Sequence, residues 1–129
     1  MRFMLMQDYY VEGLEPMSQW APEDAKAHID FQNRLNDELR ETGELVEAQA
    51  LTPVAKTVTS DGTGAPVVTD GPFIESKELL AGYRMVDVES LERALEIAAQ
   101  ASAAPGPGGV PIAMEIVVRE VMWNSNTDL

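Results

Sequence analysis

The tripeptide Asp70-Gly71-Pro72 most restricts how this chain can fold, because it interrupts a run of strand-forming residues. Proline lacks a backbone N–H group, fixes its own φ angle and disfavours the helical conformation for the residue before it. The chain must therefore turn sharply between the β-prone segment 67–69 and the extended pattern of residues 79–88. Loops that a rigid scaffold holds between two strands often carry functional sites.

The segment that follows this turn combines apolar and charged side chains. Phe73 can anchor the loop on the body of the protein. The charged residues Glu75, Lys77 and Glu78 come directly after it. Two interpretations are open: Asp70 caps its own backbone in an Asx-type turn, or the loop belongs to a binding site.

A chain of 129 residues is large enough to bury one hydrophobic core. We therefore expect a single domain over residues 1–123 and a C-terminal tail over residues 124–129. The absence of cysteine excludes disulfides, thiolate nucleophiles and cysteine metal ligands. Residues 1–6 are too short for a signal-peptide core, and no apolar run approaches the roughly 20 residues that a membrane span requires. These features predict a cytoplasmic protein that does not enter membranes.

Acidic residues outnumber basic residues by 22 to 9, which gives a formal net charge of −13. The acids concentrate in residues 8–47. A field of this sign repels phosphate backbones and anionic lipid surfaces. We therefore expect no binding to nucleic acid or to membranes, and a solvated helix face accounts for the acidic run.

A helix is predicted to begin at Pro22 and to end just before Gly43. Proline suits the first helical turn, and glycine accepts the left-handed conformation that commonly ends helices. At about 100° per residue, His28, Leu35 and Leu39 fall on one face of this helix. The single histidine therefore lies on the packed face, either as a hydrogen-bonded core residue or as a group that transfers protons.

Most other segments in the N-terminal half are typical of strands. Residues 2–7 form a nearly unbroken apolar run, as expected for a central strand. The segments 44–51, 54–60 and 65–69 are separated by turn residues. We predict that these three segments form an antiparallel meander.

The C-terminal half is predicted to contain a strand, a helix and a closing strand. The strand of residues 79–88 places Tyr83 and Arg84 on opposite faces, so Arg84 is either a rim residue or the partner of an internal acid. Ser90 can cap the helix, and residues 112–119 alternate as the closing strand. The helix is expected to bury four apolar side chains: Leu91, Ala94, Leu95 and Ala98.

The residues around the turn resemble the signature of the YCII-related family, also called the DGPF-domain family. The matching positions are Asp70, Gly71, Pro72, Phe73, Glu75, Lys77, Glu78, Gly82 and Tyr83. The resemblance implies a dimeric α+β barrel of ferredoxin-like halves, but no settled reaction. His28, in Ala27-His28-Ile29, resembles the helical histidine that pairs with an aspartate for acid–base chemistry in some relatives. Members are often encoded beside extracytoplasmic-function sigma factors, which implies a role in signalling or in the regulated response.

The expected order of elements is strand, helix, β-meander, helix, strand. This order predicts an α+β fold: a ferredoxin-like split βαβ arrangement with an antiparallel sheet and both helices on one face. The other sheet face would be bare, and a large apolar face on a small protein must be buried. Two such faces packed together would form the barrel that the resemblance implies, so we expect a homodimer.

Three classes of function are open. In a cofactor-independent isomerase or lyase, Asp70 would orient His28, which moves a proton on a small organic substrate, and Lys77 or Arg84 would steady a developing anion. That version requires Asp70 and His28 to face one environment. The alternatives are a small-molecule-binding or regulatory protein and a structural dimerisation module anchored by Phe73. The candidate binding residues are Gly71, Pro72, Phe73, Glu75, Lys77, Glu78, Tyr83 and Arg84.

A divalent-metal site is a weaker alternative. Asp70, Glu75, Glu78 and His28 carry suitable ligand atoms, but they form no compact ligand motif. We therefore predict no metal and no cofactor, and no residue pattern identifies a substrate.

Overall fold

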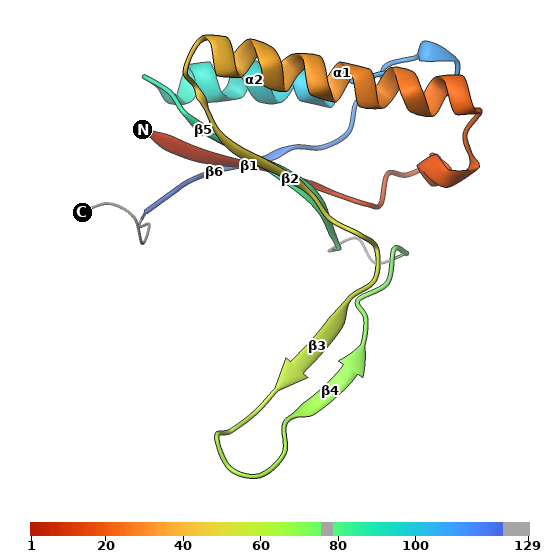
Figure 1. Ribbon diagram of the computed structural model, residues 1–129, viewed down its shortest axis with the longest axis vertical. Coiled ribbons are helices and arrows are strands. Elements are labelled where there is room, and N and C mark those ends of the chain that lie inside the picture. The colour runs from red at the N-terminus through yellow and green to blue at the C-terminus, as the bar shows by residue number, and fades with distance from the viewer. Residues whose placement is uncertain (76–78, 123–129) are drawn as a thin grey trace.

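The computed structural model describes residues 1–75 and 79–122, in which two α-helices pack on an antiparallel sheet (Figure 1). In chain order the elements are β1 (Arg2–Asp8), the short 3-10 helix η1 (Met17–Gln19), α1 (Pro22–Glu41), β2 (Leu45–Ala50), β3 (Lys56–Thr59), β4 (Val67–Asp70), β5 (Leu80–Asp87), α2 (Leu91–Ser102), the 3-10 helix η2 (Pro107–Gly109) and β6 (Val117–Glu120). The predicted tail and the candidate residues Lys77 and Glu78 lie outside the described residues.

The main sheet has the strand order β2-β5-β1-β6, and every neighbouring pair is antiparallel. Both α-helices lie on the same side of this sheet (Figure 1). This is the split βαβ arrangement, so the predicted ferredoxin-like α+β fold is confirmed. Within the described residues the sheet is open and does not close into a barrel. The dimeric barrel stays a prediction.

The predicted meander is wrong, because its three segments do not share one sheet. β2 pairs with β5 in the main sheet, whereas β3 and β4 pair with each other as a separate hairpin. The hairpin projects away from the body of the protein (Figure 1). The chain leaves the main sheet after Leu51, whose N–H still donates to the carbonyl of Ala81 at 2.8 Å. Pro53 follows, and a proline cannot donate to a strand ladder.

The closing strand is shorter than the predicted segment 112–119, because β6 begins only at Val117. The residues before it bond to the end of α2 instead of to a neighbouring strand. The N–H of Ile112 donates to the carbonyl of Ala104 at 2.9 Å, and that of Met114 donates to Ser102 at 3.1 Å. Ala113 between them has a φ of +56°, which is incompatible with a regular strand.

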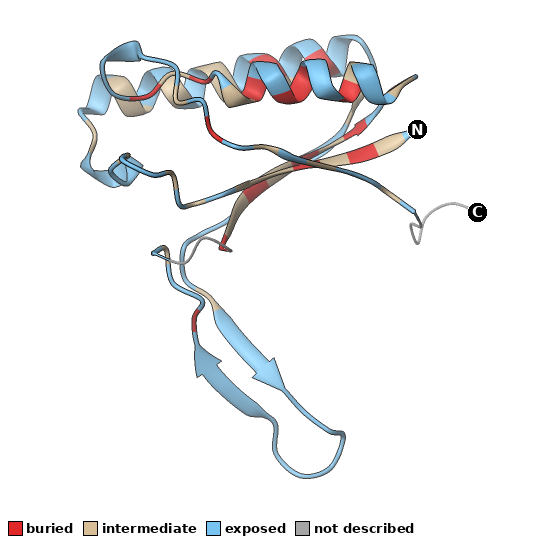
Figure 2. Cartoon of the chain, turned by 180° about the vertical axis from the view of Figure 1, so that it is seen from behind, coloured by how far each residue is buried: buried red, intermediate tan, exposed pale blue. Residues whose placement is uncertain are grey.

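The hydrophobic core lies between the helices and the sheet, where the buried residues gather (Figure 2). Phe3 and Leu5 alternate into it from β1, and Val86 enters it from β5. Leu35 and Leu39 complete it from α1 with exposed fractions of 4% and 2%. The predicted inward face of α1 is therefore confirmed.

The ends of the helices follow from local sequence, as predicted. Pro22 occupies the start of α1, and Gly43 follows that helix with a φ of +78°, where glycine is favoured. Ser90 caps α2, since its hydroxyl oxygen accepts a hydrogen bond from the N–H of Arg93 at 3.2 Å. Neither helix in the described ranges combines the length and apolar character needed to cross a bilayer.

The buried face of α2 differs from the prediction by a small rotation. Leu91 and Leu95 are 44% and 49% exposed, so expecting them in the core was wrong. The buried residues of this helix are Ala94, Ile97, Ala98 and Ala101. Both sets have helical spacing and share two alanines, so periodicity alone does not separate them. The observed choice places three alanines against the sheet and lets α2 approach it closely.

Candidate functional site

A groove of about 980 Å³ lies between α1 and the helix-covered face of the sheet. α1 has 20 residues and α2 has 12, and α1 extends past α2 in Figure 1. Residues 28–36 of α1 form one wall, and β1, β2 and β5 form the floor. The loop between β1 and α1, the connections after β2 and before β5, the end of α2 and the segment before β6 contribute the remaining lining.

Small residues on two strands leave room in the floor of the groove. Ala48 of β2 lies opposite Arg84 of β5. Gly82 shares the strand face of Arg84, because side chains alternate along a strand. A Cβ atom at Gly82 would lie 2.6 Å from the carbonyl oxygen of Gln49, so this strand contact requires glycine. Since neither small residue fills the space under α1, core packing stops at this end of the sheet.

A chain of hydrogen bonds runs along the wall of the groove. Arg84 donates from Nε to the Oδ1 atom of Asn36 at 2.7 Å. Its Nη2 atom donates to the backbone carbonyl of Gln32 at 3.1 Å and to Oε1 of the same residue at 2.5 Å. Gln32 then contacts His28 through their two Nε2 atoms at 3.3 Å, and the Nδ1 atom of His28 lies 3.0 Å from the carbonyl oxygen of Pro105.

The partners in this chain assign the hydrogens of His28. The carbonyl oxygen of Pro105 can only accept, so Nδ1 must carry a hydrogen. The Oε1 atom of Gln32 accepts from Arg84, which leaves the amide nitrogen of Gln32 to donate to the Nε2 atom of His28. Both ring nitrogens are therefore bonded within the protein, as in the predicted core role of this histidine.

Arg84 is a buried cation with neutral partners. Its exposed fraction is 7%, and burial lowers the pKa of its guanidinium to about 10, so the group remains charged at neutral pH. No carboxylate of residues 1–75 or 79–122 forms an ion pair with it. The predicted partnership with an internal acid is therefore absent from the described part of the chain.

One nitrogen of Arg84 has no hydrogen-bond partner among the described residues. The hydrogen bonds of this guanidinium leave from Nε and Nη2. Among the described residues, no buried side-chain nitrogen or oxygen lacks a hydrogen-bond partner. The Nη1 atom therefore has accessible surface, and Arg84 is among the residues that line the groove.

An aromatic residue lies beside His28 on the wall. The rings of Trp20 and His28 meet edge to face, with centroids 5.6 Å apart and an interplanar angle of 84°. The indole Nε1 atom of Trp20 donates to the carbonyl of Glu15 at 2.8 Å, which fixes the indole within its loop. The groove thus has an aromatic surface next to its polar chain.

The structure does not bring Asp70 and His28 together. Asp70 lies at the end of β4 in the projecting hairpin, where its exposed carboxylate forms an ion pair with Lys56 of β3. His28 is bonded to Gln32 and Pro105 in the groove wall. The two side chains occupy different environments within this chain, so the structure does not support the version in which Asp70 orients His28. A catalytic role for either residue by itself stays a prediction.

Gly71, Pro72 and Phe73 lie at the base of the hairpin and outside the groove lining. The N–H of Gly71 donates to the carbonyl of Ala55 at 2.9 Å, and the hydroxyl of Thr57 donates to the carbonyl of Gly71 at 2.8 Å. Gly71 has a φ of +109°, and a Cβ there would lie 3.3 Å from the ring of Phe73. Phe73 itself is 62% exposed, so it does not anchor the loop in the core of its own chain.

Three predicted binding residues belong to the groove lining: Glu75, Tyr83 and Arg84. Alternation along β5 places the side chain of Tyr83 on the sheet face opposite to that of Arg84. The hydroxyl of Tyr83 donates to Glu47 at 3.1 Å. Partial burial and this carboxylate together raise the pKa of Tyr83, with burial the larger cause. Among the described residues, no three histidine or carboxylate groups gather closely enough to hold a metal ion.

Sequence reasoning missed the role of Asn36 and of Gln32 in holding Arg84. A signal was present, because His28, Gln32 and Asn36 follow one another at intervals of four residues. Residues at this spacing are neighbours on a helix surface. A row of hydrogen-bonding side chains beside the apolar face of α1 therefore indicated a polar partner on the sheet.

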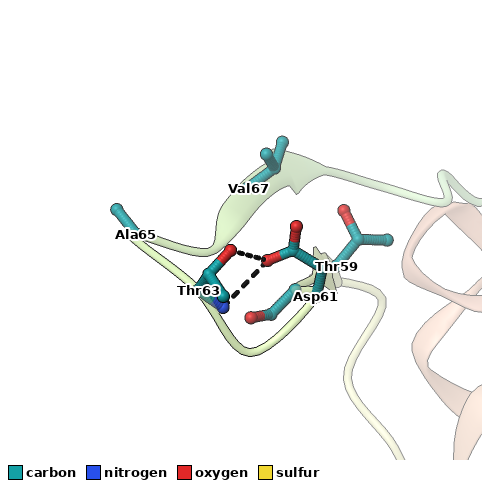
Figure 3. Close-up of a pocket in the computed structure, with 6 residues that line it drawn as sticks. Thr59, Asp61, Thr63, Ala65 and Val67 are labelled. Carbon is teal, nitrogen blue, oxygen red and sulfur yellow. Dashed lines mark hydrogen bonds between the residues drawn. The ribbon is translucent and has the colours of Figure 1, made fainter.

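The tip of the hairpin forms a second, shallow hollow, which Figure 3 shows. Asp61 accepts hydrogen bonds there from the backbone N–H and the hydroxyl of Thr63, at 2.9 and 2.8 Å. These bonds, the backbone bond first, lower the pKa of the Asp61 carboxyl. The contacts are those of an Asx-type turn, so we interpret this hollow as a result of the turn and not as a ligand site.

The chain belongs to the family of YCII-related domains, which it matches over residues 1–114. The match covers every residue that lines the groove except Ile116, which precedes β6. The family assignment based on the residues around Asp70 is therefore confirmed.

A relative in Rhizobium meliloti (strain 1021), named "Uncharacterized protein R00369", is 39% identical to this chain over 75 residues. The aligned region covers 52% of this chain and 60% of the relative. The similarity thus extends over little more than half of either protein, and the relative's name states no activity.

Proposed function

We propose that this YCII-related protein binds a small organic molecule in the groove under α1. The observation that carries the proposal is the hydrogen-bond chain from Arg84 to Pro105, which lies along a largely apolar groove. Ligand sites are typically apolar cavities of about 300–1,000 Å³ with a few fixed polar groups. A fixed polar chain beside an apolar surface can orient a ligand at little entropic cost.

The proposal is tested with N-phenylnaphthylamine, a neutral dye whose fluorescence rises in apolar sites. Ala48→Phe places a ring on the floor of the groove, since Ala48 lies opposite Arg84. Val46→Phe is the matched control, because Val46 is on the same strand, is 40% exposed and does not line the groove. We expect saturable dye binding by the parent and by the control, and roughly tenfold weaker binding by Ala48→Phe. Equal binding by all three proteins would contradict the proposal.

A cofactor-independent acid–base enzyme is the second candidate, and the position of His28 on the groove wall favours it. Proton transfer through Nε2 would require His28 to release the amide of Gln32. Nitrogen chemical shifts of the imidazole report its tautomer. We expect the form with hydrogen on Nδ1, unchanged in Asp70→Asn because Asp70 bonds to Lys56. A change of tautomer in that variant would support the acid–base pair.

Two further roles remain predictions from the sequence. One is regulation linked to extracytoplasmic-function sigma factors, and the other is that of a dimerisation module. The exposed ring of Phe73 supports the second of these, because an exposed aromatic side chain gains by burial against a partner. Substitution of Phe73 would dissociate a dimer that depends on it.

A further inference from the structure

We propose that the ligand of the groove carries a single carboxylate, which binds the guanidinium of Arg84. This inference rests on the proposed function and specifies the chemical class of the ligand. It begins from the contrast between Arg84 and other cations of the chain. Arg2, Lys26, Arg40, Lys56 and Arg93 each form an ion pair with an acid of the chain.

Arg84 is the buried exception to this pairing. The sequence has 22 acidic residues against 9 lysines and arginines, so carboxylates are in excess. Even so, none in the described ranges pairs with Arg84, which is only 7% exposed. A buried charge is usually paired, and an unpaired one that faces a cavity indicates that a ligand supplies the opposite charge.

The hydrogen bonds of Arg84 hold the guanidinium ready for such a partner. Asn36 accepts the hydrogen bond from Nε. Two oxygen atoms of Gln32 accept hydrogen bonds from Nη2, so both hydrogens of Nη2 have acceptors. The Nη1 atom keeps its two N–H groups for the groove. Because three neutral acceptors fix the guanidinium plane, Nη1 presents its donors in one direction.

The charges around the groove favour a monoanion over a phosphate. Among the described lining residues, Arg84 is the sole lysine or arginine. One cation balances the single charge of a carboxylate, whereas a phosphate dianion would keep one unbalanced negative charge. The apolar part of the groove, with Trp20, fits an unsaturated or aromatic body attached to the carboxylate.

Cinnamate and cinnamamide test the inference, because they have nearly the same shape and differ in charge. Displacement of N-phenylnaphthylamine from the parent protein at neutral pH gives both affinities. We expect cinnamate to bind about tenfold more tightly than cinnamamide, because its carboxylate can form a charge-assisted hydrogen bond with the guanidinium in a buried site. Arg84→Gln should remove this preference, and Arg119→Gln, which changes a cation outside the groove lining, should keep it.

The comparison in the parent protein does not depend on how well Arg84→Gln folds. Equal affinity for the acid and the amide would overturn the carboxylate assignment while leaving the proposed function intact. Tighter binding of phenyl phosphate than of cinnamate would also overturn it. If the dye and all three compounds fail to bind, the proposed function fails together with this inference.

Discussion

At the scale of single residues, Arg84 is the position where burial and charge conflict. Burial lowers the pKa of its guanidinium from its ordinary value to about 10, which corresponds to roughly 3 kcal/mol against the charged form. Asn36 and Gln32 offset part of this cost through neutral oxygen atoms. The remainder is a cost that a bound anion would reduce, so binding and stability are coupled at this residue.

Asn36→Ala tests the support of Arg84. The substitution removes the acceptor of Nε and leaves a buried charged donor without that partner. We expect the free energy of unfolding in urea to fall by roughly 1–3 kcal/mol. The control is Asn33→Ala, an exposed residue on the same helix that also lines the groove. Equal and small losses in the two variants would show that Asn36 does not stabilise the guanidinium.

At the scale of elements, Arg93 and Glu44 join the start of α2 to the connection between α1 and β2. Arg93 donates from Nε and Nη2 to the two carboxylate oxygens of Glu44 at 2.8 and 2.9 Å. The bonds from Arg93 are the main reason that the pKa of Glu44 lies below its usual value of 4.5. The paired, charged form of Glu44 is thus favoured in the folded protein.

The pH dependence of stability should report this ion pair. A carboxyl whose pKa is lower when folded stabilises the protein above its unfolded pKa, and this contribution is lost as pH falls through the folded pKa. We expect Glu44→Gln to reduce the free energy of unfolding by roughly 1 kcal/mol at neutral pH. Thermal unfolding at a series of pH values should show the difference shrinking below pH 4.5. An exposed control, Glu41→Gln, should show no comparable trend, and a difference independent of pH would contradict the assignment.

At the scale of the whole molecule, one face of the main sheet has no helix of residues 1–75 or 79–122 over it (Figure 1). Since Phe3 and Leu5 point into the core, alternation along β1 places Met4 and Met6 on the other face, with Met85 opposite Met4. The hairpin of β3 and β4 also exposes valines, including Val58 at 58%. Apolar surface of this kind on a small protein favours self-association.

We propose a homodimer through this face, and sedimentation equilibrium tests it. Met85→Lys introduces a charge at the centre of the sheet, whereas Leu95→Lys introduces the same charge on the exposed side of α2. We expect the parent and Leu95→Lys to sediment as dimers and Met85→Lys to sediment as a monomer, because burying a charged side chain in an apolar interface is costly. A monomeric parent protein would refute the proposal.

Much of the fold was predictable because its signals are local. The proline and glycine at the ends of α1, the serine cap of α2 and the apolar run of β1 each depend on a few neighbouring residues. The hairpin was assigned to the wrong sheet because the pairing of strands depends on distant partners. The same limit applies to the site, where His28 and Arg84 were recognised as candidates but the link between them was not.

The sequence by itself determined the family, the α+β class and the buried face of α1, since these follow from residue type and spacing. Only the tertiary structure decided that Asp70 pairs with Lys56 in a projecting hairpin and that Arg84 is held by Asn36 and Gln32. Arg84 and Asn36 are 48 residues apart, and their contact exists because α1 crosses β5 when the core packs. Contacts between distant elements depend on the geometry of that packing, which no short stretch of sequence contains.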